Sequence, residues 1–288
     1  MLELQKREYL KAIIGATATG KSDFAIDLAE KSGAEILSLD SLSIFKEIDI
    51  VSAKPNKNDL SRVKHHGIDE IFPNEKFSVK IFTELYEKLK NENLIIVGGT
   101  SFYLKTLLTG LSPVPEISEN SIQKRDEKLE NLEEAHQFLA NLDSVWGEKV
   151  KSSDKYRIEK GLDIYFETGE TPTQFFTNHK PKPIITEPIE IINLQMDRDK
   201  LRARIWKRTE QMLEKGMIDE VEGLLNKYGE NIEPMRAIGL KETLQFLRGD
   251  ISSKKELIDL IATHTSQFAK RQRTFNRTQF QNVENIDL

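Results

Sequence analysis

The strongest constraint on the fold is a glycine-rich segment that follows a short apolar run near the N-terminus. It is Gly15-Ala16-Thr17-Ala18-Thr19-Gly20-Lys21-Ser22, which matches the pattern G-x-x-x-x-G-K-[ST] in full. The run Tyr9–Ile14 predicts a strand before it, and helical apolar spacing over 21–31 predicts a helix after it. In that context the backbone N–H groups point at a phosphate. We predict a polyphosphate site, with Lys21 as counter-charge and Ser22 reaching Mg²⁺; the motif does not say which polyphosphate.

The rest of the chain continues the alternation of strand and helix signals. The pattern predicts further strands at 35–39, 94–97 and 189–194, and helices at 79–90, 101–108, 198–215, 217–227 and 251–271. Such alternation is typical of an α/β fold with a parallel sheet covered by helices on both faces. Between two proline-containing boundaries, residues 114–186 are helical in pattern and highly charged. We therefore predict one phosphate-loop α/β core, made of 1–113 and 187–288, with a helical insertion domain at 114–186.

Composition limits the class of protein. The chain of 288 residues has no cysteine, which excludes disulfides, thiolate metal sites and cysteine nucleophiles. Apolar residues make up 38% and charged residues 31%, and no apolar run approaches the roughly 18 residues that a membrane span requires. The N-terminus has no signal-type apolar region. We expect a soluble, cytoplasmic protein with no membrane partner, acting as a monomer.

The formal net charge of −5 conceals a local excess of positive charge near the C-terminus. Lys270, Arg271, Arg273 and Arg277 lie in a stretch with no acidic residue between Asp259 and Glu284. A second group of bases lies at 155–160. Clusters of this kind are usually solvated helix faces, but the missing acids favour contacts with a phosphate backbone.

Three further segments resemble the tRNA dimethylallyltransferases, the isopentenyltransferases that modify an adenine next to the anticodon. Residues 38–55 resemble the second signature of that family, Gly98-Gly99-Thr100 with Tyr103 the third, and Lys270-Arg271-Gln272 with Thr274 and Arg277 the C-terminal one. Other positions fall in the family's order and approximate spacing: Asp154, Arg157, Arg204, Arg208, Glu220, Arg236 and Gly239. The ordered set covers nearly the whole chain.

The resemblance implies a reaction and a role for particular residues. A dimethylallyl group passes from dimethylallyl diphosphate to N6 of the adenine, with Mg²⁺ as cofactor, and a carboxylate accepts the amine proton, which suits Asp40. The Thr100 hydroxyl would lie beside the reacting amine, and Arg208 would join residues 15–22 at the diphosphate. From the residues alone, Asp40 and Thr100 could equally cap a turn or a helix, and Arg208 could be a surface arginine.

The resemblance also implies a tRNA partner, held by its anticodon arm against the helical insertion. A base in a stack cannot be alkylated, so the adenine must turn out into the site. The residues expected to contact tRNA are Asp40, Ser41, Leu42, Ser43, Tyr156, Arg157, Lys160, Arg236, Lys270, Arg271, Arg273 and Arg277. Ser43, Phe45 and Leu240 depart from the family pattern, which leaves individual base contacts open.

Three other classes compete with this interpretation. A small-molecule kinase would share the loop and Mg²⁺ but needs an arginine-rich lid, and residues 116–134 hold seven acids against three bases. A relative that prenylates free adenine nucleotides would not need the C-terminal basic cluster. A nucleotide-hydrolysing RNA switch would need a motor signature, and none is apparent in this sequence. His65 and His66 are adjacent in the sequence, and adjacent side chains of a strand point to opposite faces, so they predict no metal site.

Overall fold

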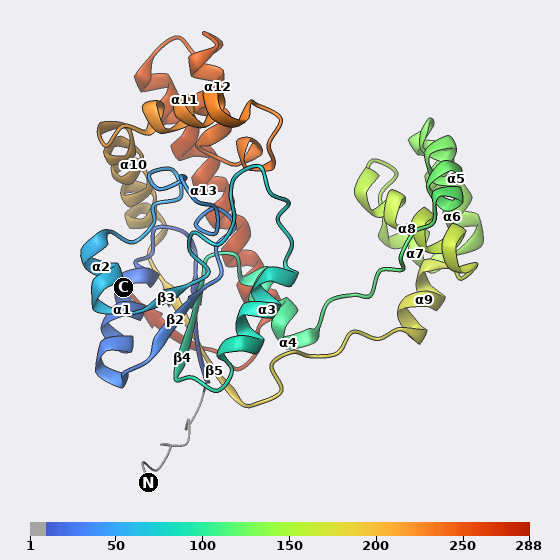
Figure 1. Ribbon diagram of the computed structural model, residues 1–288, viewed down its shortest axis with the longest axis horizontal. Helices are drawn as coiled ribbons and strands as arrows, with labels where there is room; N and C mark the ends of the chain where they lie inside the picture. The colour runs from blue at the N-terminus through green and yellow to red at the C-terminus, as the bar shows by residue number, and fades with distance from the viewer. Residues whose placement is uncertain (1–9) are drawn as a thin grey trace. The chain divides into compact units, whose positions relative to one another are not determined.

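The computed structural model describes residues 10–288, which form two compact units (Figure 1). The first unit, residues 10–108 and 184–288, contains a six-stranded sheet in the order β3-β2-β4-β1-β5-β6. All its neighbouring strands are parallel. Its strands are β1 (Leu10–Gly15), β2 (Glu35–Ser38), β3 (His65–His66), β4 (Leu94–Gly98), β5 (Ile189–Gln195) and β6 (Glu284–Asp287).

Helices cover both faces of this sheet, as the sequence predicts. Alternate residues of β1 divide between two apolar cores: Ala12 and Ile14 belong to one, Ile13 to the other. The smaller core includes Ala25, Ile26 and Ala29 of α1, while α3, α4, α11, α12 and α13 contribute to the larger one. The helices of this unit are α1 (Lys21–Ser32), α2 (Lys57–Arg62), α3 (Lys80–Leu89), α4 (Ser101–Thr109), α10 (Arg198–Glu214), α11 (Met217–Tyr228), the 3₁₀ turn η1 (Glu233–Arg236), α12 (Leu240–Leu247) and α13 (Lys254–Gln279).

The second unit, Thr109–Pro183, contains helices and no strand within its described residues. Its helices are α5 (Glu119–Leu129), α6 (Leu132–Leu142), α7 (Ser144–Lys149), α8 (Lys155–Thr168) and α9 (Pro172–Asn178). Leu139, Trp146, Ile158 and Leu162 are buried together in a separate apolar core. A Cβ on Gly161 would lie 2.8 Å from the Leu139 side chain, so glycine allows α6 and α8 to approach closely.

The predicted strand at 9–14 is present as β1, and Tyr9 lies outside the described residues. The helix predicted at 251–271 is wrong in its bounds, because α13 begins at Lys254 and continues to Gln279. Its C-terminal half continues because Ala269, Gln272 and Asn276 form a buried stripe. The short elements α2, β3, α12 and β6 were not predicted, since two to eight residues carry too little periodicity. Among residues 10–288, no helix has the length and apolar character that crossing a membrane requires.

Candidate active site

The segment between β1 and α1 forms a tight loop at the carboxyl edge of the sheet. A Cβ on Gly15 would lie 2.6 Å from the carbonyl oxygen of Leu194, so only glycine fits beside β5. Ala18 and Gly20 have φ angles of +64° and +93°, which turn the chain back toward α1. Gly20 is the N-cap residue of α1, and it has no side chain that could cap the first N–H groups of the helix. The loop therefore presents backbone N–H groups and the positive end of a helix dipole to an anion.

Lys21 lies folded over this loop. Its side chain is buried, with only 9% of the residue exposed, and Nζ donates to the Ala16 carbonyl at 2.6 Å. Thr19 donates its hydroxyl to the same carbonyl at 2.8 Å. The pKa of Lys21 is lowered to about 7, first by burial and second by the charge of Arg208, while Asp40 opposes this shift. A bound polyanion would raise this pKa again, so the site favours a multiply charged ligand.

Two arginines of α10 extend the positive charge beyond Lys21. Arg208 is half-buried, and burial lowers its pKa, with Asp40 raising it and Arg204 lowering it. A Cβ on Gly20 would lie 3.5 Å from the Arg204 guanidinium, which places Arg204 against the loop. Arg204 was not among the predicted site residues. Its spacing of four residues from Arg208, one helical turn, was the signal that could have found it.

Asp40 follows β2 at the same edge of the sheet. Its Oδ1 accepts the backbone N–H groups of Leu42 and Ser43, both at 2.9 Å. The turn-capping role that the sequence left open is therefore present. Among the described residues no hydrogen bond engages Oδ2, so the carboxylate retains a free acceptor. Its charge helps to raise the pKa of the neighbouring Tyr103 to about 12, after burial as the larger cause and against a hydrogen bond with Ser41.

Thr100 lies after the Gly98-Gly99 turn that ends β4. A Cβ on Gly98 would lie 2.9 Å from the Leu39 carbonyl, and one on Gly99 would lie 3.7 Å from Lys21 Nζ. The turn thus brings Thr100 between the end of β2 and the phosphate loop. Its carbonyl accepts the N–H of Tyr103 at 2.9 Å. Its half-buried hydroxyl makes no hydrogen bond to any residue of 10–288, so Thr100 does not cap α4 through its side chain.

Gln272 of α13 forms hydrogen bonds to both the phosphate loop and the Gly98-Gly99 turn. Its Oε1 accepts the N–H of Thr17 at 2.8 Å, and its Nε2 donates to the Gly99 carbonyl at 2.6 Å. Only 7% of Gln272 is exposed. Its charged neighbours Lys270, Arg271 and Arg273 were predicted as site residues, but Gln272 itself was not. Its position on the buried stripe of α13 was the sequence feature that could have identified it as a site residue.

The four basic residues in the C-terminal half of α13, Lys270, Arg271, Arg273 and Arg277, do not share one face. Lys270 and Arg271 line a groove of about 550 Å³ together with Gln267, Thr274, Phe275 and Thr278. The Arg271 guanidinium also lies over the Phe268 ring, 5.7 Å from its centroid. Arg273 is rotated about 200° from Arg271 around the helix axis. It lies one turn beyond Ala269, which packs with Leu201 and Ile205 of α10.

The other residues predicted to contact tRNA lie in two places. Ser41, Leu42 and Ser43 form the turn that Asp40 caps, and Arg236 is exposed at the end of η1. In the helical unit, Tyr156 is 70% exposed. The basic side chains near Tyr156 each form an ion pair: Arg157 contacts Asp154 at 3.0 Å, and Lys160 contacts Asp163 at 2.8 Å. Asp163 is buried and also binds Arg125, so Lys160 has a structural partner.

A metal ion would find few protein ligands at this site. Ser22, in the first turn of α1, follows Lys21 directly and is exposed. In residues 10–288, no cluster of three or more His, Asp or Glu side chains could hold a metal. His65 contacts the Val63 carbonyl at 2.8 Å and His66 contacts Glu35 at 2.6 Å, so neither points to a shared ion. Mg²⁺ fits only with Ser22 as one ligand and phosphate oxygens and water as most of the others.

The fold and the loop define a P-loop α/β protein with a carboxylate, Asp40, at the same sheet edge as a cluster of cations. Residues 43–279 match the family model of IPP transferase. A tRNA dimethylallyltransferase from Sulfurovum sp. is 50% identical over 278 residues, which cover 94% of this chain and 92% of that protein. The chain belongs to the IPP transferase family. These matches do not support the kinase and hydrolytic-switch interpretations.

Solved structures agree with this assignment. The tRNA delta(2)-isopentenylpyrophosphate transferase of Staphylococcus epidermidis is 29% identical, with a TM-score of 0.66, and the match covers 97% of this chain and 92% of that one. A eukaryotic dimethylallyltransferase described as acting on tRNA is 23% identical, with a TM-score of 0.83, covering 97% and 73% of the two chains. The second likeness concerns the fold alone.

Proposed function

We propose that this chain transfers a dimethylallyl group from dimethylallyl diphosphate to N6 of an adenine next to the anticodon in tRNA. The observation that carries the proposal is the arrangement at one sheet edge: the cationic loop with Lys21, Arg204 and Arg208 lies close to a carboxylate and a free hydroxyl. Transfer of a cationic alkyl group needs both an anion-binding site for the leaving group and a base for the nucleophile.

The loop side suits the diphosphate. Backbone N–H groups of residues 15–22 other than that of Thr17, together with the start of α1, would bind its oxygens, with Lys21, Arg204 and Arg208 supplying positive charge. As the allylic C–O bond breaks, negative charge grows on the diphosphate, where these groups stabilise it. Mg²⁺, held by the Ser22 hydroxyl and phosphate oxygens, would supply further neutralising charge to the leaving group.

The Asp40 side suits the adenine. The amine attacks the allylic carbon, a C–N bond forms, and the free Oδ2 of Asp40 takes the proton that N6 loses. The N–H groups of Leu42 and Ser43 fix Oδ1 and thereby orient the carboxylate. The Thr100 hydroxyl, which has no protein partner among the described residues, would accept or donate a hydrogen bond at the same amine. Dimethylallyl-tRNA and diphosphate leave.

The tRNA itself would contact residues of both units. We assign the exposed Lys270, Arg271 and Arg236 of the core to its backbone, and Tyr156 and Arg157 of the helical unit to its anticodon arm. The helical unit, predicted as 114–186 and separated in the structure as Thr109–Pro183, would act as the clamp for this arm. We place the reaction in the cytoplasm, where tRNA is found, and assign it to the monomer.

The test is to incubate the protein with labelled dimethylallyl diphosphate, Mg²⁺ and either unmodified tRNA or AMP. We expect label to enter tRNA and not AMP, and Lys21→Ala to abolish most of the transfer. Equal labelling of AMP would show that the acceptor is a free nucleotide. ATP hydrolysis without any prenyl transfer would overturn the proposal.

A further inference from the structure

The chain after Asp40 runs through a long turn, residues 41–54, which we call the acceptor loop. It contains no helix or strand of its own apart from a single bridge between Phe45 and Ile71. The loop begins with Ser41–Ser43, next to the Asp40 carboxylate. A segment of this length without internal secondary structure holds one conformation only if other parts of the chain bind its polar backbone groups.

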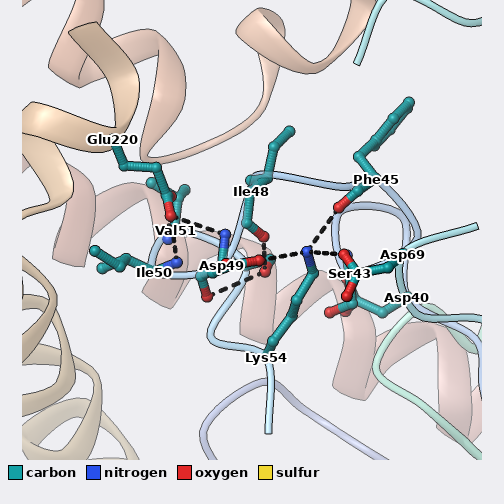
Figure 2. Close-up of polar contacts among 11 residues, drawn as sticks. Asp40, Ser43, Phe45, Ile48, Asp49, Ile50, Val51, Lys54, Asp69 and Glu220 are labelled. Atoms are coloured by element: carbon teal, nitrogen blue, oxygen red, sulfur yellow. Dashed lines mark hydrogen bonds and ion pairs between the residues drawn. The ribbon is translucent and has the colours of Figure 1, made fainter. Parts of the chain in front are cut away.

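Glu220 of α11 supplies the largest such contact. Its Oε2 accepts the N–H groups of Asp49 and Ile50 at 2.8 and 2.7 Å, and its Oε1 accepts that of Val51 at 3.0 Å (Figure 2). Three consecutive backbone donors therefore end on one carboxylate. Hydrogen bonds to an ionised acceptor are stronger than neutral ones, so this is a firm attachment of the acceptor loop to α11.

Lys54 closes the acceptor loop from the other end. Only 5% of its side chain is exposed, and its Nζ donates to the Phe45 carbonyl at 2.7 Å and to Asp49 and Asp69 at 2.6 Å each (Figure 2). The three donors of the ammonium are all used. Asp49 is thus held twice, through its side chain by Lys54 and through its N–H by Glu220.

These contacts lie on one side of the active site. Glu220 and Lys54 bind residues 45–51 and Asp69, and none of their hydrogen bonds involves residues 15–22, Arg204 or Arg208. Between β2 and the anchored part lie Leu39, Asp40, the turn that Asp40 caps, and Ile44. A change at Glu220 should therefore disturb the adenine side and leave the diphosphate side intact.

We propose that Glu220 is a positioning residue for the tRNA acceptor. It holds the acceptor loop in the conformation that binds the anticodon arm, and so it acts on tRNA recognition without touching the reacting atoms. This inference rests on the proposed function. It differs from a role in folding alone, which would lower stability but leave the balance between the two substrates unchanged.

The test compares Glu220→Gln with Glu222→Gln, which removes the same charge from an exposed position of the same helix. Glutamine keeps one acceptor oxygen but turns an NH₂ group toward the remaining backbone donor. We expect the KM for tRNA to rise about tenfold, the loss of roughly one charge-assisted hydrogen bond, and the KM for dimethylallyl diphosphate to stay within about twofold. Glu222→Gln should match the wild-type protein in both. Amide exchange over 49–51 should accelerate only in Glu220→Gln.

A folded Glu220→Gln protein with unchanged KM for tRNA, or with both KM values raised equally, would overturn the inference. If this variant does not fold, Lys54→Arg serves in its place, because guanidinium geometry cannot reproduce the three ammonium bonds; an unchanged KM for tRNA would then be decisive. Transfer by the wild-type protein tests the proposed function separately, since it does not depend on either variant.

Discussion

The phosphate loop and the acceptor loop meet at the same edge of the sheet, but they are built in different ways. Residues 15–22 are positioned by their own backbone, between a buried strand and the start of α1. The acceptor loop depends on side chains far away in the chain, above all Glu220 on α11. The first region therefore depends less on distant side chains, although Gln272 binds its Thr17 N–H, whereas the second depends on contacts between α11 and the acceptor loop.

The largest expected effect concerns the carboxylate that borders both regions. Asp40→Asn keeps an oxygen that can accept the N–H groups of Leu42 and Ser43, so the turn should persist, but the side chain can no longer take a proton. We expect the chemical step to slow by about 10²–10⁴-fold with little change in the KM values. Single-turnover rates at saturating tRNA and donor measure this, with the exposed Asp250→Asn as the matched control. Near-normal turnover in a folded Asp40→Asn protein would reduce Asp40 to its capping role.

The next largest effect belongs to the phosphate loop. Lys21→Ala removes the buried ammonium that lies over the loop, and we expect kcat/KM for the donor to fall by about 10²–10³-fold, as when one preorganised donor to a developing anion is lost. The binding of tRNA alone, measured without donor, should be unchanged. A matching loss of tRNA affinity would show that the two regions are not separable at this residue.

Lys21 also predicts a pH signature for the loop. Because its pKa is about 7, the free protein is largely deprotonated there at pH 8, and a bound diphosphate should restore the proton. We expect uptake of about 0.9 proton per donor at pH 8 and little at pH 6. Calorimetry in buffers of different ionisation enthalpy measures this uptake, and Lys21→Met should abolish it. The same pKa affects stability: the unfolded chain keeps this proton up to about pH 10.5 and the folded chain only to about pH 7, so the destabilisation caused by burying Lys21 decreases as pH rises from 7 to 10.5.

A substitution at Gln272 tests whether the diphosphate side and the adenine side of the site are coupled. Gln272→Leu leaves the Thr17 N–H and the Gly99 carbonyl without their partner, which should cost about 2 kcal/mol of unfolding free energy. Because Thr17 belongs to the loop and Gly99 precedes Thr100, we expect both KM values to rise, each by about tenfold. Denaturant melts and steady-state kinetics together check this. A rise in one KM alone would assign Gln272 to a single side.

The difference between the phosphate loop and the acceptor loop also explains which parts of the structure could be predicted from the sequence. The motif at 15–22 and the apolar periodicity of β1, α1 and β4 are local, so the core and the loop were predictable. Gln272 and Glu220 act on groups 173 and about 170 residues away in the chain, and no local pattern encodes such pairs. Asp40 was found only through its resemblance to a family signature, and its two roles became compatible once Oδ1 and Oδ2 could be considered separately.

The smallest expected effect separates the basic residues of α13. Arg271 faces the groove with Lys270 and Phe275, whereas Arg273 lies on the other side of the helix, so one tRNA surface should contact only the first. We expect Arg271→Ala to lower the slope of log K against log salt for tRNA binding by about 1, and Arg273→Ala to leave the slope unchanged. Titrations at four or more salt concentrations, with both variants and the wild-type protein, measure the slopes. Equal decreases would mean that tRNA contacts α13 on both sides. The tRNA-binding surface would then extend beyond the groove.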